Sequence, residues 1–164
     1  MLLELSRSGA VFDKSETYRY WLWREWNADL PRVSFVMLNP STADADRNDP
    51  TIRRCIQFAK TWGYGAVDVV NLFAYRATEP QMLRQATAPI GQENDRHLQT
   101  ACAKADQVVL AWGNWGSLHG RDRHVLELLG DRSVVCLGMT RSNQPRHPLY
   151  VKGDTALQIY RQPC

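Results

Sequence analysis

Residues 33–72 read VSFVMLNPSTADADRNDPTIRRCIQFAKTWGYGAVDVVNL, and this stretch determines the expected fold class. It begins with an apolar run that ends at a turn, which is typical of a buried central strand. A helix is predicted next, because Asp49 can cap it, Pro50 suits its first turn, and apolar residues recur at three- and four-residue spacing up to Gly63. A second β-branched run follows at residues 66–72. Strand, helix and strand in this order predict a parallel crossover and therefore an α/β fold.

The segment before this unit predicts an N-terminal hairpin. Residues 10–12 (AVF) and 18–26 (YRYWLWREW) are the two strands, because aromatic residues suit a pleated, half-buried surface. Regular alternation along the second strand assigns its side chains to two faces. One face is expected to carry Tyr18, Tyr20, Leu22 and Arg24, and the other Trp21 and Trp23.

The segment after this unit continues the alternation of helices and apolar runs. Helices are predicted near residues 79–85, 92–104 and 121–129, and apolar runs occupy 107–112 and 134–137. We therefore expect a single domain, residues 1–164, built as a three-layer α/β/α sandwich. Its sheet should be short, four-stranded and mainly parallel, with the hairpin added at one edge.

Composition narrows the class of protein. The chain has 164 residues, 44% of them hydrophobic and 23% charged, which is enough for one core without disulfides or a structural metal. Its cysteines, Cys55, Cys102, Cys136 and Cys164, form no metal or redox motif and are expected to be reduced thiols. With no leader and no long apolar run, we expect a cytoplasmic protein that makes no membrane contact. A net charge of +3 permits phosphate contact but falls short of a basic stripe.

Polar residues follow each of the four predicted core strands. In open parallel sheets, ligands bind beyond the carboxyl ends of the strands, because the loops converge there. The loops in question carry Asn39-Pro40-Ser41-Thr42, then Asn71, then Trp112-Gly113-Asn114, and finally Arg146-His147-Pro148. We expect these side chains to meet in one crevice.

Several motifs together resemble one known family. They are MLNPSTAD, DPTIRRC, WGYG, VVNLFAYRAT, GQENDRHL, LAWG and PRHPLY, in this order along nearly the whole chain. The series resembles the bacterial and phage family known as domain of unknown function 1643. This resemblance is specific, but it implies almost no chemistry.

A second resemblance implies a reaction. An Asn-Pro loop after the first strand, an Asn ending the second, Trp-Gly after the third and a late His-Pro are similar to the uracil-DNA glycosylase superfamily. That resemblance implies a glycosylase-like fold in which Asn39 positions the attacking water, Asn71 pairs with a flipped base and His147 supports the departing base anion. Ser41, Thr42, Trp112, Gly113, Asn114 and Arg146 would complete the substrate-binding set. Trp112 and Gly113 would also be structural.

These residue types suit hydrolysis of an N-glycosidic bond. The transition state resembles an oxocarbenium ion, so the protein must hold a water against the sugar and stabilise negative charge on the base. An amide orients water without deprotonating it, and it can pair with a pyrimidine edge. The sequence departs from the active families at Met37, where they have glycine, and at Leu149, where they have serine. Catalytic and non-catalytic interpretations therefore both stay open.

A structural alternative exists for each of these residues. Asn39 and Ser41 can make a local turn, Asn71 can bond to neighbouring backbone, and His147 can be a backbone-bonded imidazole. The arginines near the crevice, Arg53, Arg54, Arg141 and Arg146, can hold a phosphate together or be separately solvated. The acidic loop at residues 44–49 lacks the glycine and the glutamate of an EF-hand, which leaves a looser Mg²⁺ site as a minor alternative.

Three function classes remain open at this point. The first is a nucleobase- or nucleotide-binding domain that hydrolyses N-glycosidic bonds in nucleic acid. The second is a non-catalytic module that binds nucleic acid or a protein, and the third is an enzyme that processes a small nucleoside. We expect no cofactor and no metal site, and the sequence does not indicate an oligomeric state.

Overall fold

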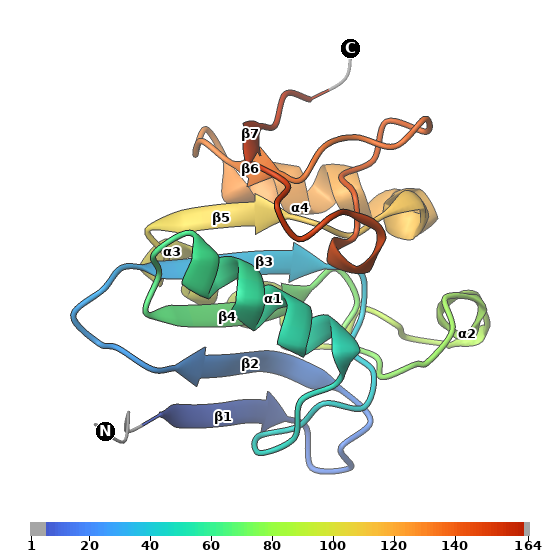
Figure 1. Ribbon diagram of the computed structural model, residues 1–164. Coiled ribbons are helices and arrows are strands. Elements are labelled where there is room, and N and C mark those ends of the chain that lie inside the picture. Colours follow the sequence, from blue (N-terminus) through green and yellow to red (C-terminus); the bar gives the residue numbers. More distant parts are fainter. Residues whose placement is uncertain (1–5, 163–164) are drawn as a thin grey trace.

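A computed structural model describes residues 6–162 as a seven-stranded mixed sheet covered by helices (Figure 1). The strands are β1 (Arg7–Phe12), β2 (Arg19–Glu25), β3 (Arg32–Met37), β4 (Ala66–Asn71), β5 (Gln107–Leu110), β6 (Val135–Cys136) and β7 (Gln158–Ile159). Their order across the sheet is β1-β2-β4-β3-β5-β6-β7. The prediction of an α/β fold is confirmed.

The sheet is larger and less parallel than predicted. Strands β4, β3, β5 and β6 are neighbours that run parallel. The pairs β1–β2, β2–β4 and β6–β7 are antiparallel, so half of the six pairings in the described residues are of each kind. The four predicted core strands are thus the parallel ones, but a mainly parallel four-stranded sheet is not confirmed, because the whole sheet has seven strands. The hairpin extends the sheet through β4, and β7 is too short, at two residues, to leave a periodic signal.

The β3–α1–β4 unit forms as its sequence indicates. Helix α1 (Pro50–Thr61) begins where Asp49 Oδ1 accepts a 2.9 Å hydrogen bond from the backbone N–H of Ile52. This is an N-cap that satisfies one of the free donors of the first turn. The buried face of α1 packs on one side of the sheet, against apolar residues of β2, β3, β4 and β5 that include Phe35 and Val67. Asp49 thus fixes where the helix starts, above the end of β3.

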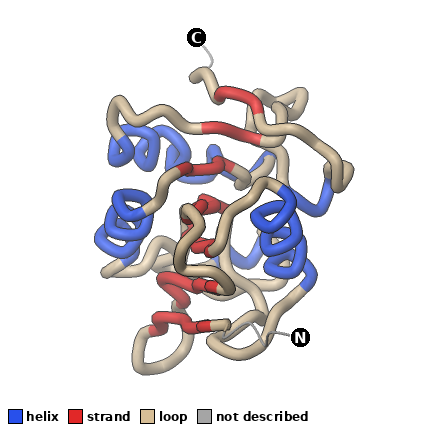
Figure 2. The backbone as a smooth tube through the Cα atoms, turned by 60° about the vertical axis from the view of Figure 1, so that its left-hand side comes forward, coloured by secondary structure: helices blue, strands red, loops and turns tan. Residues whose placement is uncertain are grey.

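Other helices cover the opposite side of the sheet. Helices α3 (Asn94–Lys104) and α4 (Arg121–Leu129) pack there, against a second buried cluster that includes Val70 and Leu110. Figure 2 shows the strands stacked between helices on either side, which makes three layers. Three short helices, α2 (Gln81–Gln85), η1 (Asn114–Gly120) and η2 (Pro148–Tyr150), lie in the loops.

A bulge in the hairpin overturns the predicted alternation along β2. Val11 pairs with Trp21 and Phe12 pairs with Arg19, so Tyr20 is an extra residue with no opposite partner. Tyr20 and Trp21 both lie against His97 of α3, with ring centroids 5.2 and 6.3 Å away. Arg19 lies on the other face, where it bonds to Ala43. The extra residue interrupts the alternation between Arg19 and Trp21, so Tyr20 lies on the same face as Trp21 and not, as alternation predicted, on the face of Leu22.

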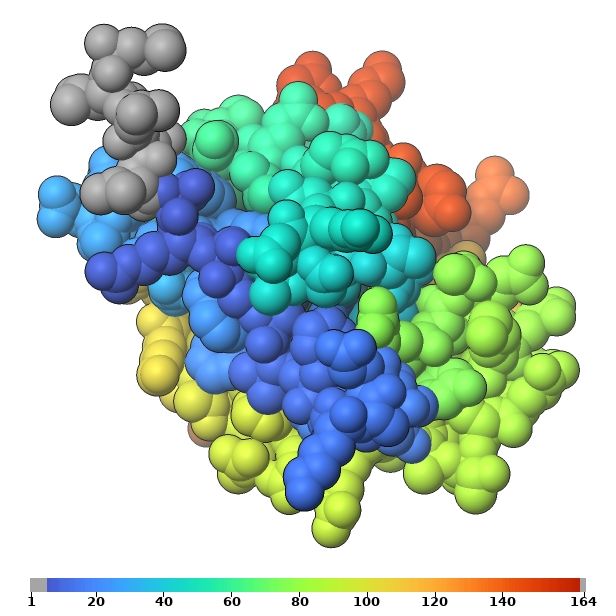
Figure 3. Space-filling model, turned by 90° about the horizontal axis from the view of Figure 1, so that it is seen from below, coloured from blue at the N-terminus to red at the C-terminus, as the bar shows by residue number. Residues whose placement is uncertain are grey.

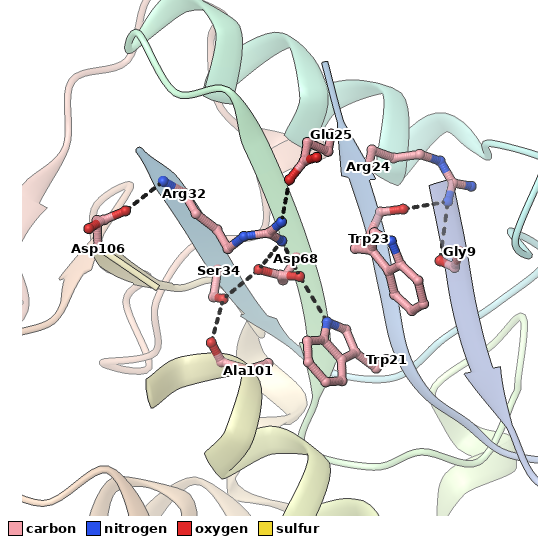
Figure 4. A network of polar contacts seen from close by, with 10 residues as sticks. All are labelled: Gly9, Trp21, Trp23, Arg24, Glu25, Arg32, Ser34, Asp68, Ala101 and Asp106. Atoms are coloured by element: carbon pink, nitrogen blue, oxygen red, sulfur yellow. Dashed lines mark hydrogen bonds and ion pairs between the residues drawn. The ribbon is translucent and has the colours of Figure 1, made fainter. Parts of the chain in front are cut away.

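A buried ion pair stabilises the α3 side of the sheet (Figure 4). Asp68 is fully buried and accepts hydrogen bonds from Arg32 Nη1 at 2.8 and 2.9 Å and from Trp21 Nε1 at 2.8 Å. Burial raises the pKa of Asp68, and the bonds from Arg32 oppose that rise. Arg32 also pairs with Glu25 at 2.9 Å, so it links three strands. Asp68 thus belongs to the scaffold and lies away from the cavity described below.

Cys55, Cys102 and Cys136 are buried free thiols, while Cys164 lies outside the described residues. Burial raises the pKa of Cys102 to about 12, so this thiol is protonated at neutral pH. Among residues 6–162, no helix combines the length and apolarity that crossing a membrane requires.

Candidate functional site

A cavity of about 660 Å³ opens at the carboxyl ends of β3, β4 and β5. This volume falls within the range of about 300–1,000 Å³ that is typical of small-molecule sites. The cavity wall includes every residue that the sequence predicted for the site: Asn39, Ser41, Thr42, Asn71, Trp112, Gly113, Asn114, Arg146 and His147. The strand order therefore brings these segments together, while the role of each residue stays a prediction.

Asn71, the last residue of β4, is buried in the cavity wall with only 1% of its surface exposed. Its Oδ1 has no hydrogen-bond partner among the described residues. The main chain around it is fixed, because Asn94 Nδ2 donates to the carbonyls of Asn71 and Leu72 at 2.9 and 3.1 Å. Arg121 Nε adds a bond of 2.7 Å to the Leu72 carbonyl. A rigid backbone thus carries a free, buried side-chain acceptor.

Asn39 braces the loop after β3. Its Nδ2 donates to the carbonyl of Ala77 at 2.8 Å and to that of Pro40 at 3.0 Å. The first bond crosses to the segment that follows β4, so it is more than a local turn. Both amide hydrogens are used in this way, which leaves Oδ1 as the group of Asn39 that could interact with a ligand.

His147 is a neutral imidazole with a defined tautomer. Its Nδ1 accepts a 3.1 Å hydrogen bond from the backbone N–H of Leu149 and thereby caps η2. A neutral ring that accepts at Nδ1 carries its proton on Nε2. Burial lowers the pKa of His147 to about 4, although the nearby Asp49 carboxylate favours the charged form. At neutral pH, His147 is therefore an uncharged N–H donor in the cavity wall.

The Trp112-Gly113-Asn114 segment holds two loops together. The backbone N–H of Gly113 donates to the Pro145 carbonyl at 2.8 Å, and Gly113 has a φ of +77° that favours glycine. Asn114 Oδ1 accepts from the Thr140 hydroxyl at 2.6 Å. Trp112 is 1% exposed and its indole N–H is already bonded to Gln144. Trp112 is thus available to a ligand only through ring contact.

The four arginines near the cavity, Arg53, Arg54, Arg141 and Arg146, do not form a cluster there. Arg54 donates to the carbonyls of Pro148 and Val151 at 3.2 and 2.5 Å, so it braces the loop around η2. Arg53 and Arg141 are exposed and do not line the cavity, and of the four only Arg146 does. Of the two alternatives for these arginines, the structure favours separate placement, because Arg54 bonds to a neighbouring loop while Arg53 and Arg141 are exposed outside the cavity.

The cavity wall includes two groups that sequence reasoning missed. Arg19 is 2% exposed and lines the cavity. Regular alternation along β2 places Arg19 on the α3 side of the sheet, and only the bulge turns it to the α1 side. Tyr150 is 79% exposed, and its ring lies 5.5 Å from that of His147. An aromatic residue two positions after the His147-Pro148 motif was a signal that could have identified Tyr150.

The acidic loop at residues 44–49 forms hydrogen bonds of its own. Asp44 Oδ1 accepts from the backbone N–H groups of Asp46 and Arg47 at 2.9 and 2.8 Å, and these bonds lower the pKa of Asp44. Asp49 caps α1 as described above. Within residues 6–162, no three His, Cys, Asp or Glu side chains lie close enough to hold a metal ion.

Comparison with known proteins gives one match. A family model described as "Protein of unknown function (DUF1643)" matches residues 19–149 of the 164. The matched segment includes the whole cavity wall except Tyr150. No curated protein and no solved structure matches the chain.

Proposed function

The chain belongs to the DUF1643 family over residues 19–149, and from this premise we propose that its cavity binds a nucleobase or nucleotide. Of the function classes that the sequence left open, this one accounts best for the polar groups in the wall. A base edge presents both donors and acceptors, and it needs a rigid partner that offers the same.

The observation that carries this proposal is the unpartnered Oδ1 of Asn71. Leaving a buried acceptor without a hydrogen bond costs about 1–3 kcal/mol, so such groups are uncommon unless a ligand completes them. Asn71 lies in the cavity wall, and bonds from Asn94 and Arg121 fix the chain around it. A donor on a base edge would satisfy Oδ1, while the amide N–H₂ could meet a base carbonyl.

His147 favours hydrolysis of an N-glycosidic bond as a second candidate function. In that reaction, a water oxygen bonds to the anomeric carbon of the sugar, and the bond from that carbon to the base nitrogen breaks. The electron pair stays on the base, and the water loses a proton to solvent. The Nε2–H of His147 would stabilise the developing base anion, and Oδ1 of Asn39 would orient the water. These roles match the order of residues that resembles the uracil-DNA glycosylase superfamily.

Binding and base release are tested on two separate sets of variants. Isothermal titration of bases, nucleosides and nucleotides would use wild-type protein, Asn71→Ala and the exposed surface amide variant Gln85→Ala as the matched control. We expect Asn71→Ala to weaken binding at least tenfold and Gln85→Ala to change it less than twofold. Base release would be measured on single-stranded, duplex and mismatched DNA with Asn39→Ala and His147→Ala.

Each outcome separates the function classes. If wild-type protein releases a base and both Asn39→Ala and His147→Ala abolish this release, hydrolysis is supported. Binding that depends on Asn71, with no release from any substrate, supports the binding domain alone. If neither bases, nucleosides nor nucleotides bind the wild-type protein, the proposal is wrong, and a module that recognises a protein partner becomes the better interpretation.

A further inference from the structure

Arg19 is a buried cation in the cavity wall without an ion-pair partner. Its exposed fraction is 2%, and its Nε has no hydrogen-bond partner in the described part of the chain. Nη1 donates to the Ala43 carbonyl at 3.2 Å. None of the ion pairs formed within residues 6–162 includes Arg19. Buried charges in proteins are usually paired, so Arg19 lacks the partner that its burial calls for.

The charge of Arg19 persists at neutral pH. Burial lowers the pKa of its guanidinium to about 10, against the opposing effect of the Asp49 carboxylate. Arg24 and Arg76 lie near enough to lower this pKa further. At pH 7 the group is therefore still a cation, held in a region where other cations are close.

Asp49 does not replace the missing partner. Its Oδ1 accepts from Ile52 N–H at 2.9 Å and its Oδ2 from Ala43 N–H at 3.4 Å, so both oxygens serve the N-cap and its loop. The charged residues of the cavity wall are Arg19, Arg146 and Asp49, which sum to one net positive charge. Asp49 occupies the N-terminus of α1 as its cap, so this helix terminus is not free to receive a ligand. The positive charge available to a ligand therefore comes from the arginines.

We propose that the cavity holds the terminal phosphate of a nucleoside monophosphate against Arg19, with the base at Asn71. The inference rests on the proposed nucleobase site and names its ligand class. The planar guanidinium presents several N–H groups that match the geometry of phosphate oxygens. With one N–H of Nη1 bonded to the Ala43 carbonyl, Nε and Nη2 remain for such oxygens. A terminal phosphate can enter the cavity together with its nucleoside, whereas a phosphate inside a polymer would have to carry both flanking nucleotides toward a buried group.

Arg19 has a structural role that any test must separate from ligand binding. Like Arg24 and Arg76, it donates to a backbone carbonyl in the loop between β3 and α1. Figure 3 shows this loop, in cyan, beside the blue N-terminal hairpin. Lysine at position 19 could keep the bond to Ala43 and the charge while losing the guanidinium fork. A variant that only loosens the loop would weaken nucleoside and nucleotide binding alike.

The experiment compares a nucleoside with its 5′-monophosphate by isothermal titration. Wild-type protein is expected to bind the monophosphate at least tenfold more tightly than the nucleoside. In Arg19→Gln this difference should fall below twofold while nucleoside affinity changes less than threefold, and Arg19→Lys should retain part of the difference. Asn71→Ala should weaken both ligands by the same factor. Arg53→Gln, which removes an exposed charge outside the cavity, is the matched control and should leave the difference intact.

Several results would overturn the inference, and they are distinct from failure of the proposed function. If wild-type protein binds the nucleoside and the monophosphate with equal affinity, the proposed phosphate site is wrong, while the proposed nucleobase site still stands. Tighter binding of a dinucleoside whose only phosphate is internal overturns the assignment to a terminal phosphate. If bases, nucleosides and nucleotides all fail to bind, the nucleobase site is wrong. Titration with inorganic phosphate then tests the phosphate site at Arg19 separately.

A measurement on wild-type protein covers the case in which Arg19→Gln does not fold. Inorganic phosphate is titrated into ¹⁵N-labelled protein, and the Nε–H resonance of Arg19 is followed after assignment with Arg19→Lys. A saturable shift of that resonance, with no comparable shift for Arg53, supports the phosphate site. The same resonance is then followed with the nucleoside 5′-monophosphate. If it is unchanged at a saturating concentration of that ligand, the phosphate site at Arg19 is wrong.

Discussion

The indole N–H of Trp112 donates a 2.7 Å hydrogen bond to Oε1 of Gln144, and this bond joins the segment directly after β5 to the loop that carries His147. Both side chains are buried. Gln144 Nε2 donates in turn to Asp122 Oδ2 at 3.2 Å, so the loop is also tied to α4. The position of His147 therefore depends on contacts that never touch its own ring.

Gln144→Leu should lower the free energy of unfolding by about 1–3 kcal/mol, because it leaves the buried indole N–H of Trp112 without an acceptor. Urea denaturation measures this change. Asp122→Asn is the control, since it alters the outer end of the chain of bonds and keeps the indole bond. Equal stability of the two variants would contradict the prediction.

Asn71→Leu should separate stability from binding. The change removes a buried unpartnered acceptor and adds apolar surface of similar size, so thermal unfolding should occur at an unchanged or higher temperature. Nucleoside binding should be lost, because no amide remains to pair with the base. Asn94→Leu is the matched comparison and should destabilise the protein, since Asn94 donates to two backbone carbonyls. A large loss of stability in Asn71→Leu would show that the amide is structural.

Stability should fall in acid because of His147. Its pKa is about 4 in the folded protein against 6.5 ordinarily, so between these values the unfolded chain binds a proton that the folded protein does not. The contribution is complete above pH 6.5 and is lost as the pH falls toward 4, by up to about 3 kcal/mol at about 1.4 kcal/mol per pKa unit.

Urea denaturation of wild-type protein and His147→Gln across pH 4–7 measures this loss. The variant should show a flatter dependence on pH. His97 is the matched control, because burial also lowers its pKa, and His97→Gln should leave the contribution of His147 in place. Parallel curves for wild-type protein and His147→Gln would show that the ring is not buried as described.

Arg32→Met should lower the free energy of unfolding by about 3–5 kcal/mol, because the fully buried Asp68 would lose its cation. Glu25→Gln alters the more exposed arm of the same network and should cost less than about 1 kcal/mol. The double variant Arg32→Met with Asp68→Leu should recover most of the loss, since no unpaired charge then remains. Failure of that recovery would mean that the pair matters for more than charge balance.

Tyr150→Ala should weaken nucleobase binding about 5- to 100-fold without changing stability. The ring is 79% exposed beside His147, and stacking on a base contributes about 1–3 kcal/mol. Fluorescence or calorimetric titration measures the affinity. The neighbouring variant Leu149→Ala removes exposed apolar surface without an aromatic ring and should have a smaller effect. Similar effects of both would indicate general apolar contact instead of stacking.

The sequence predicted those features that short periodic segments encode. The β3–α1–β4 unit follows from an apolar run, the Asp49 cap and Pro50, all of which act locally. The convergence of Asn39, Asn71 and His147 also followed, because parallel strands direct their following loops to one edge.

The features that were missed depend on contacts between distant segments. The bulge that turns Arg19 to the α1 side is set by pairing with β1, and no periodicity within β2 encodes it. Strand β7 has two residues, fewer than any alternation needs. For Arg54 the sequence offered a phosphate contact or solvation, but its bonds go to backbone carbonyls more than ninety positions away in the chain.

The loop between β3 and α1 has a consequence for ligand association. Arg19, Arg24 and Arg76 bond to its carbonyl groups within the chain itself, so folding already removes conformational freedom from this loop. A ligand would then meet a preorganised wall, and little of its interaction energy would be spent on ordering the chain. Association should accordingly proceed in a single kinetic phase whose rate rises linearly with ligand concentration, as for a rigid receptor.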